Sequence, residues 1–202
     1  IEAITLMLPL LIIADMMSVK SFWKKWDTAL LAKLIPGAIV GVVIANLLID
    51  IVNAEHLRNF IAFICITFAI KNIGFKTLQL SLVNNRYGAY VMSAMSGITS
   101  TLVHAGGPPL IIYFTAIGLA QSKFVATAAA FFAIMNIIKL IGVVSLGLLT
   151  FDVVLTALAF VPLAVFGNWL GVKINQHLDK QRFLKVMNYL LLLLGIWLLF
   201  TK

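Results

Sequence analysis

Two glycines followed by two prolines interrupt an apolar stretch in the middle of the sequence, at Gly106, Gly107, Pro108 and Pro109. This order cannot continue a helix, because proline has no N–H to donate and disfavours helical backbone in the residue before it. A helix that opens here presents free N–H groups and the positive end of its dipole, which favours an anion. Since glycine has no side chain to hold a ligand away from the backbone, the segment predicts an anion site at Gly106 and Gly107, with Pro108 beside it.

Three polar side chains precede the glycines and would add hydrogen-bond donors to that site, namely Ser100, Thr101 and His104. The flanking residues 98–103 and 110–117 are apolar, and the turn contains no Asp, Glu, Lys or Arg. Unwound backbone at membrane depth is tolerated only where protein or a water-filled cavity covers it. We therefore expect a broken helix inside the membrane, and the alternative is an ordinary turn outside it.

Lys139 lies near the end of a long apolar run, three residues after Asn136. Residues three apart share one face of a helix, and ionisable groups inside a membrane are costly and usually face a cavity. Lys139 would supply a fixed positive charge for an anionic substrate, and Asn136 would help to orient it. We expect Lys139 to point at the opened backbone of Gly106 and Gly107. The alternative is that its ammonium group reaches an interface about two turns away.

Asp15 lies in the first apolar run and falls near Asn136 when the two halves of the sequence are compared. A carboxyl group at such a position is a candidate for carrying a coupling proton or for pairing with a cation. The alternative is a helix-end residue at the membrane interface, close to Lys20.

The sequence lacks the patterns of an enzyme or a metal site, since no HExxH, GxSxG or Walker motif occurs. Ser100 and His104 are four residues apart, but the break after them ends the helix, and no acid stands nearby to orient the histidine. The single cysteine, Cys65, lies in an apolar run and predicts a small buried side chain. We expect no catalytic residues, no cofactor and no metal. The net charge of +8 comes without a basic helix, which argues against nucleic acid as a partner.

The elements that must position these residues are membrane helices. Of the 202 residues, 62% are hydrophobic and 11% are charged, whereas soluble domains are about 45–50% apolar and about 25% charged. A spanning helix needs about 20 mostly apolar residues, and runs this long do not alternate as barrel strands do. We predict an all-α integral membrane protein, a polytopic helical bundle. Its apolar runs are residues 1–19, 28–50, 57–74, 87–103, 110–120, 124–147, 152–175 and 183–201.

The two halves of the sequence share a pattern, because Pro36 and Gly41 are matched 126 positions later by Pro162 and Gly167. Small residues also follow each glycine four positions on, which usually means close packing on another helix. The pattern predicts two homologous repeats. They would comprise the remainder of a first repeat at 1–76, a polar inter-repeat loop at 77–86 and a second repeat at 87–202. The offset further implies that about 40 residues of the first repeat, including its own broken segment, precede Ile1.

The charged loops indicate how the repeats are oriented. Loops 20–26, 71–86 and 173–182 carry several Lys or Arg residues, whereas loop 148–151 carries none. Lys and Arg accumulate in cytoplasmic loops, and the three rich loops share one side only if the repeats have opposite orientations. Inverted repeats recur in transporters. The alternative is two tandem bundles with accidental loop charges.

The broken segment and the residues that follow it resemble a signature in the second half of the sulfite exporter TauE/SafE family. The members of this family are also called toluenesulfonate uptake permeases. The resemblance is carried by Thr99–Pro109 together with Thr127, Phe131, Phe132, Asn136 and Lys139, and by the steps Ala14–Asp15 and Trp26–Asp27. It implies two homologous halves that each open with a glycine-rich broken segment. It also implies transport of sulfite, sulfonates or related small organic anions across the bacterial inner membrane. Direction and substrate differ among members, so the resemblance implies neither.

We therefore predict a multi-pass secondary transporter, or permease, in the bacterial inner membrane. Its partners would be the lipid bilayer and a small anionic substrate. The candidate substrate-binding residues are Ser100, Thr101, His104, Gly106, Gly107, Pro108, Asn136 and Lys139, with Asp15 as the candidate for the coupling proton. The alternative function is a non-transporting membrane scaffold subunit of a larger complex. The sequence predicts no oligomeric state.

Overall fold

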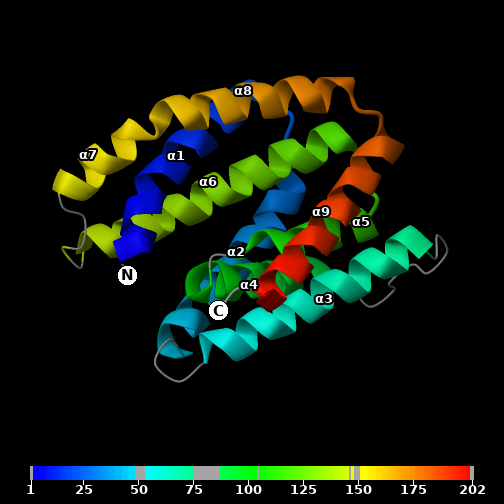
Figure 1. The fold of residues 1–202 in the computed structure, drawn as a ribbon, viewed down its shortest axis with the longest axis horizontal. Helices are drawn as coiled ribbons and strands as arrows, with labels where there is room; N and C mark the ends of the chain where they lie inside the picture. Colours follow the sequence, from blue (N-terminus) through cyan, green and yellow to red (C-terminus); the bar gives the residue numbers. More distant parts are fainter. Residues whose placement is uncertain are drawn as a thin grey trace. The chain divides into compact units, whose positions relative to one another are not determined.

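The computed structural model describes residues 2–48, 53–74, 87–103, 105–145, 147 and 151–200. These residues form helices and no strand (Figure 1). The helices are α1 (Glu2–Ser21), α2 (Thr28–Leu48), α3 (Ala54–Gly74), α4 (Gly88–Leu102), α5 (Gly107–Ala116), α6 (Gln121–Ser145), α7 (Phe151–Ala159), α8 (Val161–His177) and α9 (Lys180–Phe200). Within the described ranges, α2, α3, α6 and α9 are long and apolar enough to cross a membrane. The predicted all-α membrane class is confirmed.

One predicted span differs from the structure. Residues 152–175 were expected to form a single helix, but α7 ends at Ala159 and α8 begins at Val161. Pro162 explains the division, because proline has no N–H and is favoured in the first turn of a new helix. The N–H of Phe160 instead donates to the carbonyl of Ala157 at 3.1 Å. The matching proline, Pro36, lies inside the continuous helix α2.

The chain divides into two compact units that alternate along the sequence. The first unit comprises residues 1–31 and 122–178, and the second comprises 32–121 and 179–202. Each unit therefore takes segments from both predicted repeats. The repeat boundaries stay a prediction about the sequence, and most of the predicted loop at 77–86 lies outside the described residues.

In the first unit, α1 contacts both α7 and α8. The hydroxyl of Ser18, near the end of α1, donates to the side-chain oxygen of Asn168 in α8 at 2.8 Å. Helix α1 also contacts α7, which precedes α8. Helices α1 and α8 therefore run in the same direction (Figure 1). Lys20 at the end of α1 and Lys173 near the end of α8 therefore lie toward the same end of this unit. That their loops share one side of the membrane stays a prediction.

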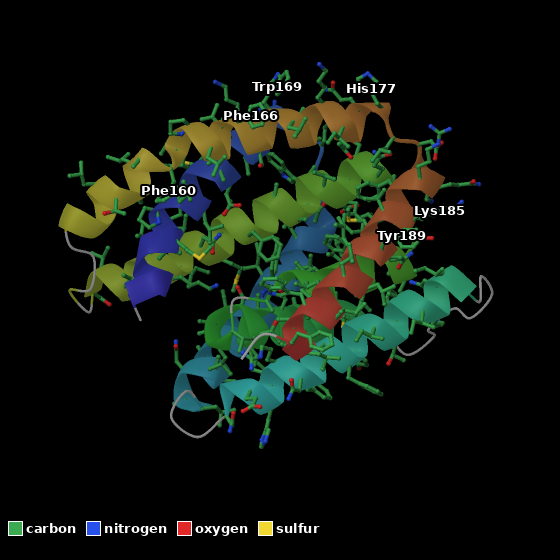
Figure 2. The ribbon with its side chains drawn as sticks, viewed as in Figure 1. Phe160, Phe166, Trp169, His177, Lys185 and Tyr189 are labelled. Carbon is green, nitrogen blue, oxygen red and sulfur yellow. The ribbon has the colours of Figure 1, made fainter. Side chains whose placement is uncertain are left out.

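Helix α8 has no buried side chain among the residues described. Phe160, Phe166 and Trp169, labelled in Figure 2, are 47%, 57% and 54% exposed. Large apolar side chains at this exposure are costly in water but suit contact with lipid. The helix surface is thus that of a membrane protein.

In the second unit, α3 and α9 pack in opposite directions. The side-chain amide of Asn72 donates to the side-chain oxygen of Asn188 at 3.1 Å. Further along, Gly195 lies so close to α3 that a Cβ there would stand 3.0 Å from the carbonyl oxygen of Ala62. Cys65 lies in this contact and is fully buried, as predicted. The end of α3 therefore adjoins the start of α9.

The small-residue spacing marks close packing in one repeat and not in the other. A Cβ on Gly41 of α2 would stand 2.8 Å from the carbonyl carbon of Ala94 in α4, and one on Gly97 would stand 3.2 Å from the nitrogen of Val42. No described atom lies within 4 Å of a Cβ built on Gly167 or Gly171. The close packing expected at Gly167 and Gly171 is therefore not found among the described residues of the first unit.

Asp27 caps the start of α2 and joins it to α6. Its carboxylate accepts hydrogen bonds from the N–H of Leu30 at 3.0 Å and from the ammonium of Lys123 at 3.3 Å, and its own N–H donates to the hydroxyl of Thr127. The hydrogen bond from Leu30 is the main cause that holds the pKa of Asp27 below its usual value, and Lys123 contributes further.

Replacing Asp27 by Ala should therefore lower the free energy of unfolding by about 1 kcal/mol, the usual cost of removing an N-cap. Because the pKa is lower in the folded protein than in the unfolded chain, the carboxylate's contribution is present above about pH 4 and is lost as pH falls through the folded pKa. Asp27→Asn, which keeps a capping oxygen, should lose less. Thermal unfolding in detergent at about pH 7 and about pH 3 tests this. An equal loss for Asp27→Ala at both pH values would contradict it.

Candidate functional site

The predicted break lies between two short helices that fold back on each other. Helix α4 ends at Leu102, α5 begins at Gly107, and the two helices contact one another. At 1.5 Å per residue, α4 is about 22 Å long and α5 about 15 Å. The hydrocarbon core of a bilayer is about 30 Å thick. Neither helix alone could cross it, so the pair is a hairpin of short helices.

Buried contacts hold the turn of this hairpin against α4. The hydroxyl of Ser96 donates to the carbonyl of Gly106 at 2.6 Å, and the N–H of Ala105 donates to the carbonyl of Thr99 at 3.1 Å. A Cβ on Gly106 would stand 2.7 Å from the Cβ of Ser100, so a larger residue would push the turn away from α4. The requirement for glycine at this position is thus steric, because the turn packs directly on α4.

Ser96 was not among the predicted site residues, although the sequence carries a signal for its role. Ser93, Ser96 and Ser100 recur every three or four residues in an otherwise apolar helix, and all three are buried. A helical face of small hydroxyls lets another backbone approach and offers it hydrogen bonds. That pattern could have identified the surface on which the turn packs.

The predicted side chains around the break differ in what they can offer a ligand. Ser100 is buried beside Gly106. The hydroxyl of Thr101 donates to the carbonyl of Gly97 at 2.8 Å, so its proton is used within α4. Pro108 is buried in the first turn of α5. His104 lies outside the described residues.

The start of α5 has no side-chain cap. Pro108 and Pro109 have no N–H to donate. The backbone donors at this helix end are therefore the N–H groups of Gly106 and Gly107 and not the full first turn of a helix. The predicted anion site therefore has two adjacent backbone N–H groups to offer.

A second cluster forms in the first unit. The side-chain amide of Asn136 in α6 donates to the carboxylate of Asp15 in α1 at 2.7 Å. Lys139 lies one turn further along α6, on the same helical face as Asn136. Asn136 is 6% exposed, and Asp15 and Lys139 are half-buried. Three residues singled out in the sequence are thus neighbours, although Asp15 and Asn136 are 121 positions apart.

The two clusters belong to different units, with the hairpin in the second unit and the Asp15 cluster in the first. Each is described within its own unit. The expectation that Lys139 points at Gly106 and Gly107 stays a prediction.

An apolar cavity of about 400 Å³ lies between α3, α4 and α5 in the second unit. Thr99, Pro108 and Pro109 line it, so it borders the turn of the hairpin. Lys71 is the charged residue in its lining, and apart from Thr67 the remaining walls are apolar side chains of these three helices. Such walls cannot replace the water around an anion's charge. We therefore expect an anionic group at the amides of the turn and not in this cavity.

Comparison with known proteins gives one match. The sequence profile of the family described as "Sulfite exporter TauE/SafE" matches residues 1–198. Neither the search of curated proteins nor that of solved structures gave a match. The family match covers nearly the whole chain and includes both clusters.

Proposed function

Because this chain belongs to the sulfite exporter TauE/SafE family, we propose that it is a secondary transporter for sulfite, a sulfonate or a related small organic anion. The family is one of membrane transporters, and the long apolar helices α2, α3, α6 and α9 make the chain a multi-pass membrane protein. We propose the bacterial inner membrane as its location, as the family resemblance implies.

The observation that carries this proposal is the hairpin of α4 and α5, whose turn ends in the uncapped start of a helix. We propose that this turn lies inside the membrane. Its apolar flanks and its buried hydrogen bonds to α4 support that depth. Oxyanion oxygens would accept hydrogen bonds from the N–H groups of Gly106 and Gly107, with Pro108, Ser100 and His104 around them. Thr101 would then act through its oxygen or by packing.

A charge to balance the anion would come from Lys139, with Asn136 orienting it and Asp15 as its partner. The hydrogen bond from Asn136 to Asp15 supports a polar cluster of fixed geometry at membrane depth. Polar and ionisable groups at such depth face protein or a water-filled pathway. The substrate would bind where both clusters can reach it.

Inverted repeats would supply the alternating access that such a transporter needs. If the hairpin enters and leaves on one side, then α6, α7 with α8, and α9 make an odd number of crossings in the repeat at 87–202. Residues 1–76 would contribute α1, α2 and α3 in the same way. An odd number gives the two repeats opposite orientations, which also accounts for the Lys-rich loops.

The purified protein in proteoliposomes tests the proposal. It should move radiolabelled sulfite or a radiolabelled sulfonate faster than protein-free liposomes do. His104→Ala should reduce that flux sharply while thermal unfolding stays cooperative. Absence of flux for all these anions would reject the transporter and favour the scaffold.

A further inference from the structure

We propose that Asp15 and the transported anion compete for the positive charge of Lys139, so that the anion binds when a proton neutralises Asp15. This inference rests on the proposed function, and it names the way in which anion transport is coupled to protons. It follows from the geometry of three side chains within the first unit, on α1 and α6.

Asn136 holds the carboxyl group of Asp15 against α6, one turn before Lys139. Its amide donates to Asp15 at 2.7 Å and is itself buried. A protonated carboxyl group keeps a carbonyl oxygen that can still accept this hydrogen bond. Protonation would therefore change the charge of Asp15 without removing the contact that positions it. The cluster can gain or lose a proton with its geometry retained.

The charges of the cluster decide which states can cross the membrane. With Asp15 ionised and no anion bound, Asp15 and Lys139 sum to zero. With Asp15 protonated and a monovalent anion on Lys139, the sum is again zero. An anion beside ionised Asp15 leaves a net negative charge, and protonated Asp15 without an anion leaves a net positive one. Unbalanced charge in a membrane is costly, so the two neutral states are the ones expected to reorient.

The proton balance of one cycle follows directly. The Asp15 carboxylate takes up one proton, its attraction to Lys139 is lost, and the anion takes its place beside the ammonium group. On the other side the anion leaves, the proton leaves, and Asp15 pairs with Lys139 again. One proton therefore moves with each monovalent anion, in the same direction.

Other charged groups on the neighbouring helices are engaged elsewhere. On α6, Lys123 binds Asp27 at 3.3 Å. On α8, the ammonium of Lys173 lies 4.9 Å from the ring centroid of Trp169, and the Nδ1 atom of His177 lies 2.8 Å from the carbonyl oxygen of Lys173. The described side chains of α7, residues 154–159, include no titratable group. On α1 itself, Lys20 lies at the exposed end of the helix, beyond Ser18. Among the described residues of these helices, Lys139 is thus the charged group on the face of α6 that carries Asn136, the partner of Asp15.

The test measures the binding of a sulfonate to the purified full chain in detergent by calorimetry, between about pH 5 and about pH 8. A sulfonate keeps its single negative charge over this range. At pH values where Asp15 is mostly ionised, the wild-type Kd should rise about tenfold per pH unit. The reason is that the fraction of protein with protonated Asp15, which is the form that binds the anion, falls about tenfold per pH unit. The same titrations in buffers of different ionisation enthalpy should show uptake of up to one proton per sulfonate.

Asp15→Asn keeps an acceptor for Asn136 but cannot titrate. Its Kd should vary less than about threefold over the range, with no proton uptake. Asp27→Asn is the control, because it removes a carboxylate from the same unit but outside the cluster. Its Kd should depend on pH as the wild-type Kd does. A wild-type Kd independent of pH, or an Asp15→Asn profile equal to that of the wild type, would overturn the competition but leave anion transport in place. No sulfonate or sulfite binding at any pH would overturn both proposals.

Discussion

Replacing Lys139 by Met is expected to abolish most of the anion flux. Met keeps much of the length and apolar volume of the side chain but removes the ammonium group. Removing the charge that pairs with a bound ligand's charge typically costs about 2–5 kcal/mol of binding free energy, and about 1.4 kcal/mol corresponds to a factor of ten. Flux of sulfite or a sulfonate at concentrations below saturation should therefore fall by at least about 25-fold. Proteoliposome uptake at equal protein density measures it.

Lys33→Met is the matched control for this prediction. Lys33 is also a lysine within an apolar helix, α2, but its side chain is exposed. It is expected to reach the interface by extending its charged end, so its replacement should leave the flux within about twofold of the wild type. A Lys139→Met protein that unfolds as cooperatively as the wild type and transports equally well would contradict the role of Lys139 as the balancing charge.

Gly41→Ala is expected to destabilise the protein, whereas the same change at Gly167 is not. A methyl group on Gly41 would stand 2.8 Å from the carbonyl carbon of Ala94, so α2 and α4 would have to separate. Overpacking of this kind typically costs about 1–3 kcal/mol. Because α4 carries Ser96, which holds the turn at Gly106, the separation should also reduce anion flux. Thermal unfolding in detergent and proteoliposome flux measure the two effects.

Gly167 is the counterpart of Gly41 in the sequence pattern, and no described atom lies within 4 Å of a Cβ built there. Ala lacks the conformational cost of Gly within a helix, so Gly167→Ala should be neutral or stabilising by up to about 1 kcal/mol. A loss at Gly167 as large as that at Gly41 would mean that this face of α8 is covered in the membrane.

The helices could be predicted because their signals are local. The length of each apolar run determines whether a membrane helix forms, and the runs at 28–50 and 124–147 correspond closely to α2 and α6. The division at Phe160 was missed, since Pro162 ends one helix while the equivalent Pro36 is accommodated within another. Backbone geometry around a single proline depends on its surroundings, and the sequence pattern alone treats the two prolines as equals.

The candidate site was only partly predictable, because contacts between side chains also depend on their surroundings in the fold. Asp15, Asn136 and Lys139 stood out because ionisable and amide groups are rare in apolar runs, but their distances could not be read from spacing. Thr101 looked like a donor to a ligand, yet its hydroxyl bonds the carbonyl of Gly97 within its own helix. Ser96 looked unremarkable, yet it holds the turn in place.

The sequence by itself determined that this chain is made of membrane helices, and it predicted an interruption near the point where α4 ends at Leu102 and α5 begins at Gly107. Those features depend on the hydrophobicity of successive residues and on the backbone restrictions of glycine and proline. Only the tertiary structure decided that α4 and α5 pack as a hairpin and that Asn136 donates to Asp15. These depend on contacts between segments as much as 121 residues apart, which packing of whole helices brings together and no local pattern encodes.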